Sequence, residues 1–75
     1  MFMIRLSPTF SAGDYDWDID LPQVPSVGDT VEVDEGGGAE SIVYRVLARR
    51  FIVQYHKGEQ LKPEQTQVLL HVEVI

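Results

Sequence analysis

Aspartates occupy every second position of one short segment: Asp14, Asp16, Asp18 and Asp20. Carboxylates at this spacing could ligate a cation, and the first three match the opening of an EF-hand calcium loop. That loop also requires glycine at its sixth position and glutamate at its twelfth. Those positions hold Ile19 and Pro25. We therefore expect no calcium site, no other metal site and no cofactor.

Other catalytic chemistry has little support in the sequence. The chain has no cysteine, and its two histidines, His56 and His71, have no metal-ligand spacing. No nucleophile-elbow motif is present. Glycines 36–38 are flanked by acids and no lysine follows them, so they do not form a phosphate loop. We expect the protein not to be an enzyme.

The residues between the aspartates indicate how the acids are positioned. Tyr15, Trp17, Ile19 and Leu21 alternate with them, and a period of two predicts a strand with one buried face. Residues two apart rise together by about 6.6 Å, so the four acids would form a line about 20 Å long. Val31 and Val33 likewise turn Glu32 and Asp34 outward.

If these two strands are neighbours, their acids merge into one surface. We expect that surface to bind a partner through Asp14, Asp16, Asp18, Asp20, Glu32 and Asp34. The alternative is a solvated outer face whose charges discourage pairing at a sheet edge.

The rest of the chain also favours strands. We expect them at about residues 2–10, 14–21, 30–34 and 66–75, with a polar loop over 56–65. The alternative to that loop is a short helical turn within 59–70, with Pro63 in its first turn. The apolar stretch 42–55 is too long for one ordinary strand, so a bulge or bend is expected near Arg49 and Arg50. Together these elements predict an all-β fold, a five- to six-stranded antiparallel barrel or orthogonal sandwich in one domain, residues 1–75.

One segment resembles SH3-like small barrels over roughly residues 25–55. The resemblance lies in the pattern Pro-x-Val-Gly-Asp-x-Val-x-Val from Pro25, the glycine loop, and Tyr44-x-Val46. It implies a barrel architecture and no particular function.

Charge is distributed unevenly along the 75 residues, whose formal net charge is −6. Nine acids and no base lie between Asp14 and Glu40, whereas five bases and three acids follow. Such an anionic protein repels nucleic-acid phosphates and anionic lipids and attracts a basic protein surface. In size and charge it is similar to small acidic inhibitors of phages and mobile elements, including anti-CRISPR and other anti-defence proteins. That resemblance implies DNA mimicry at a nucleic-acid-binding groove.

The alternative function is a structural or assembly subunit of a homo-oligomer or phage particle. Such a subunit would self-associate through apolar residues such as Leu69 and Ile75. We expect a monomer or a homodimer, with no nucleic acid or membrane as direct partner. The chain has no cysteine and no apolar run of signal-peptide or membrane-spanning length, so a cytoplasmic location is expected.

Overall fold

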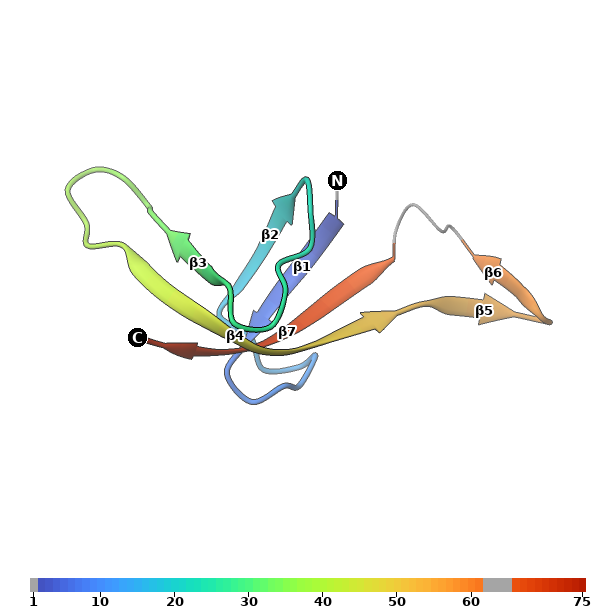
Figure 1. Ribbon diagram of the computed structural model, residues 1–75. Helices are drawn as coiled ribbons and strands as arrows, with labels where there is room; N and C mark the ends of the chain where they lie inside the picture. Colours follow the sequence, from blue (N-terminus) through green and yellow to red (C-terminus); the bar gives the residue numbers. More distant parts are fainter. Residues whose placement is uncertain (1, 62–65) are drawn as a thin grey trace.

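The computed structural model describes residues 2–61 and 66–75, which form seven strands and no helix. The strands are β1 (Phe2–Ser7), β2 (Trp17–Leu21), β3 (Thr30–Val33), β4 (Ile42–Ile52), β5 (Gln54–His56), β6 (Glu59–Leu61) and β7 (Gln67–Val74). Five of them form one curled sheet in the order β2-β1-β7-β4-β3, and β5 pairs with β6 in a separate hairpin (Figure 1). The all-β, barrel-like prediction is confirmed.

The two ends of the chain lie side by side in the sheet. β1 runs parallel to β7, with Met3 opposite Gln67 and Ser7 opposite His71. The other pairings are antiparallel, so the expectation of a wholly antiparallel sheet was wrong. β2 and β3 form the two opposite edges, and they are therefore not the neighbours that a single acidic surface required. The sheet is a half-barrel that stays open between these edges.

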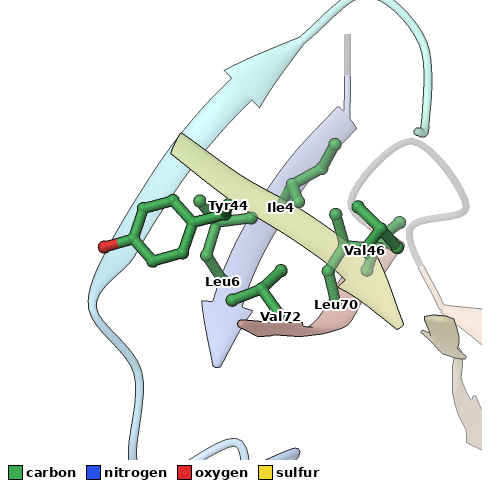
Figure 2. Close-up of a cluster of buried hydrophobic side chains, with 7 residues drawn as sticks. Ile4, Leu6, Tyr44, Val46, Leu70 and Val72 are labelled. Atoms are coloured by element: carbon green, nitrogen blue, oxygen red, sulfur yellow. The ribbon is translucent and has the colours of Figure 1, made fainter. Parts of the chain in front are cut away.

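Alternating apolar side chains fill the concave side of the sheet. The buried cluster comes from β1, β4 and β7 and comprises Ile4, Leu6, Tyr44, Val46, Val68, Leu70 and Val72 (Figure 2). Trp17, Ile19 and Leu21 of β2 pack against it from one edge, and Val31 and Val33 of β3 from the other. Full burial of one such aliphatic side chain is worth about 1.5–3 kcal/mol. The period of two therefore predicted the inward faces of β2, β3 and β7 correctly.

A bulge in β4 changes which of its residues face inward. The register shifts between Val46 and Ala48, slightly earlier than the bend expected near Arg49 and Arg50. Val46 lies opposite Val72, and Phe51 lies opposite Val68. Because the bulge inserts one residue, odd-numbered positions after it take the side that even-numbered positions held before it. Phe51 consequently shares the side of the core residues.

The convex side of the sheet is partly covered by the segment between β1 and β2. The Ser7 hydroxyl donates to the Asp14 carbonyl and accepts a hydrogen bond from the Ser11 amide at 3.0 Å. The ring of Phe10 stacks on His71, with centroids 5.3 Å apart, and the Arg50 guanidinium lies 4.2 Å from the same ring.

This cover changes two expectations. The first strand ends at Ser7 rather than near residue 10, so Phe10 lies outside the core. Leu69 lies between Arg5 and Arg50 on the neighbouring strands and is fully buried. Leu69 is therefore not available for self-association, whereas Ile75 is exposed.

Beyond Ile52 the chain leaves the body as a projecting hairpin (Figure 1). Its turn lies at Lys57 and Gly58, with φ of 51° and 81°, as a two-residue type I′ hairpin turn requires. The radius of gyration is 13.5 Å, against about 11 Å for a compact chain of this length. Part of the expected polar loop 56–65 is thus a hairpin. The alternative of a helical turn within 59–70 is wrong at Glu59–Leu61 and from Gln67 onward, which are strands; Pro63 lies outside the described residues.

Candidate functional site

The aspartate row does not form one line, because β2 begins only at Trp17. Alternation therefore holds from Trp17 to Leu21 and fails before it. Asp18 and Asp20 lie opposite Arg5 and Met3 of β1, on the convex side of the sheet. Asp14 belongs to the turn before the strand, where its amide donates to the Ser11 carbonyl at 3.1 Å.

Asp18 is already partnered within the chain. The Arg5 Nε donates to Asp18 Oδ1 at 2.9 Å and a second guanidinium nitrogen donates to Oδ2 at 3.2 Å. These hydrogen bonds raise the pKa of Arg5. The guanidinium carbon also lies 3.9 Å from the centroid of the Tyr15 ring. Tyr15 was expected in the core, but it is exposed and lies against Arg5.

Asp16 lies beside the aromatic residues Trp17 and Tyr44. The Trp17 Nε1 donates to the Tyr44 hydroxyl at 3.0 Å, and that hydroxyl donates to Asp16 Oδ2 at 3.1 Å. Burial raises the pKa of Tyr44; the bond to Asp16 and the charge of Asp16 raise it further, against an opposing effect of Trp17. The phenol therefore remains a proton donor at neutral pH and holds the Asp16 carboxylate beside the indole.

An open hollow of about 550 Å³ lies at this point, and we call it the aromatic hollow. Residues of β2, β4 and β7 and of the turn before β2 line it: Tyr15, Asp16, Trp17, Ile42, Tyr44 and Val74. Aromatic rings attract cations through their electron-rich faces, by about 0.5–1 kcal/mol at exposed sites. With a carboxylate among the rings, the hollow suits a cation on an apolar stem, such as an arginine or lysine side chain.

The other predicted acids lie on the opposite edge of the sheet. Glu32 is exposed on β3, and the Asp34 carboxylate just after it accepts a hydrogen bond from the Gly36 amide at 2.8 Å. Ile19 of β2 and Val31 of β3 pack against the same core, so the two edges flank one opening. The acids therefore lie on two opposite edge strands and do not form the single patch that the sequence suggested.

Sequence reasoning missed Arg5 and gave Tyr44 no polar role. The pairing of Arg5 with Asp18 depends on the register between β1 and β2. The alternation of apolar and polar residues in the sequence does not specify that register. The bond from Tyr44 to Asp16 joins residues 28 positions apart. In the described part of the chain, no group of three or more histidine, aspartate or glutamate side chains could hold a metal ion.

Comparisons with known proteins give no family assignment. No protein-family model, curated protein or solved structure matches the chain. Among residues 2–61 and 66–75 there is no helix with the length and apolar character needed to cross a bilayer.

Proposed function

We propose that the protein is a non-enzymatic binding module that docks on a basic surface of a partner protein. The observation that carries the proposal is the aromatic hollow, in which the Asp16 carboxylate lies beside the rings of Trp17 and Tyr44. An arginine or lysine side chain of the partner would enter this hollow. Exposed acids on the two edge strands would contact further bases of the partner.

Electrostatics supports this choice of partner. The net charge of −6 favours encounter with cationic surfaces and disfavours anionic ones. The Tyr44 hydroxyl bonds to Oδ2 of Asp16, and Oδ1 can accept a hydrogen bond from an incoming guanidinium. A nucleic-acid-binding groove is one basic surface of this kind. In its specific form, the proposal is that the protein acts as a DNA-mimicking inhibitor of the kind found among anti-defence proteins.

The chain provides its own reporter for testing the hollow. Trp17 is the only tryptophan, so its fluorescence reports occupancy. We expect a peptide with arginine flanked by lysines to change this fluorescence, with an affinity that falls as salt rises. The same peptide with citrulline, a neutral isostere, in place of arginine should bind at least tenfold more weakly.

A pair of variants separates the hollow from general charge. Asp16→Asn and Asp14→Asn remove the same charge, but only Asp16 lines the hollow. We expect Asp16→Asn to weaken arginine-peptide binding about tenfold, or about 1.4 kcal/mol, and Asp14→Asn to have a much smaller effect. Equal binding of the arginine and citrulline peptides would contradict the proposal.

A further inference from the structure

The projecting hairpin exposes apolar side chains on one side. We call residues 53–61, Val53 with β5 and β6, the arm. Phe51 at its base and Val53 and Tyr55 within it alternate and are all exposed, Tyr55 at 63%. β5 and β6 pair only with each other in the described sheets. An isolated two-stranded hairpin is marginally stable in water, so this arm would gain stability from a surface that covers it.

The arm lies at one end of the molecule, and β3 and the start of β4 lie at the other (Figure 1). β4 links the arm to the aromatic hollow, because Ile42 at its start lines the hollow and Ile52 at its end leads into the arm. Ten residue steps at about 3.3 Å give a separation of about 33 Å. The molecule is accordingly elongated, with extents of 48 × 23 × 21 Å. The arm therefore cannot reach the hollow of its own chain.

Lys57 at the tip of the arm is complementary in charge to Asp16 of the aromatic hollow. The arm also carries one acid, Glu59, and Arg49 lies at its base. The hollow suits a cation on an apolar stem, which Lys57 provides. Tyr55 adds an aromatic ring that can pack against the rings of the hollow. The arm of another molecule of this protein thus has the chemistry of the partner.

We propose that the arm docks on the aromatic hollow of a second copy of this chain, forming a homodimer. Two copies packed antiparallel place each arm beside the other copy's hollow, so one two-fold arrangement satisfies both arms and closes. The inference rests on the same hollow as the proposed function. It adds that the arm of a second copy occupies this hollow until a basic partner displaces it.

Sedimentation of the full chain over a range of concentrations tests the association. We expect a concentration-dependent dimer, and at least tenfold weaker association for Tyr55→Ser. Val27→Ser is the matched control, because Val27 is 62% exposed on the body and should leave association unchanged. A parent protein that remains monomeric at about 1 mM, where binding is worth only about 4 kcal/mol, would overturn the proposal. An unaffected Tyr55→Ser variant would do the same.

Cysteine crosslinking tests the geometry, since the natural chain has no cysteine. Tyr55→Cys mixed with Ile42→Cys should give a disulfide-linked heterodimer under mild oxidation. Tyr55→Cys mixed with Val27→Cys should give little. If Tyr55→Cys instead links mainly to itself, the arms pair with each other and the proposed docking is wrong.

The peptide assay distinguishes this inference from the proposed function. Tyr55→Ser leaves the hollow intact, so it should bind the arginine peptide at least as tightly as the parent. If the parent protein binds the peptide but does not self-associate, only the proposed homodimer is wrong, and the proposed function stands. If monomeric Tyr55→Ser fails to bind the peptide, the proposed function itself is wrong.

Discussion

The body and the arm share one sequence pattern but differ in burial. Val68, Leu70 and Val72 alternate along β7 and are fully or almost fully buried, whereas Phe51, Val53 and Tyr55 alternate in the same way and are exposed. β7 lies between β1 and β4, and apolar residues of the edge strands β2 and β3 pack against the core that its side chains help to form. The arm strands have only each other. Alternation thus identifies the apolar side of a strand but does not show what covers it.

The largest contrast is expected from one charge placed in each region. Leu70 is fully buried, so Leu70→Asp should unfold the body. An unpaired buried charge costs several kcal/mol, against a total stability of roughly 5 kcal/mol for a domain of this size. Tyr55→Asp should leave the body folded. Circular dichroism and thermal melting of both variants measure the difference, and a folded Leu70→Asp protein would contradict the assigned core.

The two tyrosine hydroxyls should also differ. Tyr44→Phe removes the acceptor of the Trp17 indole and the donor to Asp16, and should lower the free energy of unfolding by about 1–3 kcal/mol. Tyr55→Phe in the exposed arm should have no measurable effect. Urea denaturation compares the two variants. Equal losses in the free energy of unfolding would show that the hydrogen bonds of Tyr44 with Trp17 and Asp16 do not stabilise the body.

A matched pair of glycines compares the two regions at the backbone. Gly28 and Gly58 have φ of 95° and 81°, and added Cβ atoms would meet no neighbour at either position. Alanine in this region of φ costs about 1–2 kcal/mol. The Gly28 amide bonds to the Val46 carbonyl at 2.8 Å, so Gly28→Ala should lower the melting temperature. Gly58→Ala should instead speed amide exchange within the arm, while the melting temperature stays unchanged.

The smallest effect is a dependence of body stability on alkaline pH. The pKa of Tyr44 is raised above its ordinary value of 10.0. Below pH 10 the folded and unfolded chains both keep this proton, so its contribution is fully present. As pH rises further, the unfolded chain releases the proton first, and stability falls. Denaturation above pH 10 should show a smaller decline for Tyr44→Phe than for the parent, and parallel declines would contradict this account.

Local patterns predicted the strands of the sheet and the inward faces of β2, β3 and β7, whereas the site depended on long-range pairing. The strand around Trp17 could be predicted because Ile19 and Leu21 continue its alternation. The positions of Asp14 and Asp16 could not, because Ser7, Ser11 and Tyr44 bind the segment before the strand. These partners enter through the sheet register and through a turn held by a serine hydroxyl. The alternation predicted outward-facing acids on two strands, but it did not predict that these strands form opposite edges of the sheet.

The parallel pairing of β1 with β7 has a consequence for how the chain folds. Residues 3–7 must meet residues 67–71, so a loop of some sixty residues has to close before the central strand is in place. Closing such a loop costs entropy before any contact compensates for it, and proteins dominated by distant pairings fold in milliseconds to seconds. During synthesis, Ile4 and Leu6 remain without their β7 neighbours until Gln67–Val74 has emerged. The apolar first strand would then be exposed to other chains for longest, so aggregation during expression should be most sensitive to changes in β1.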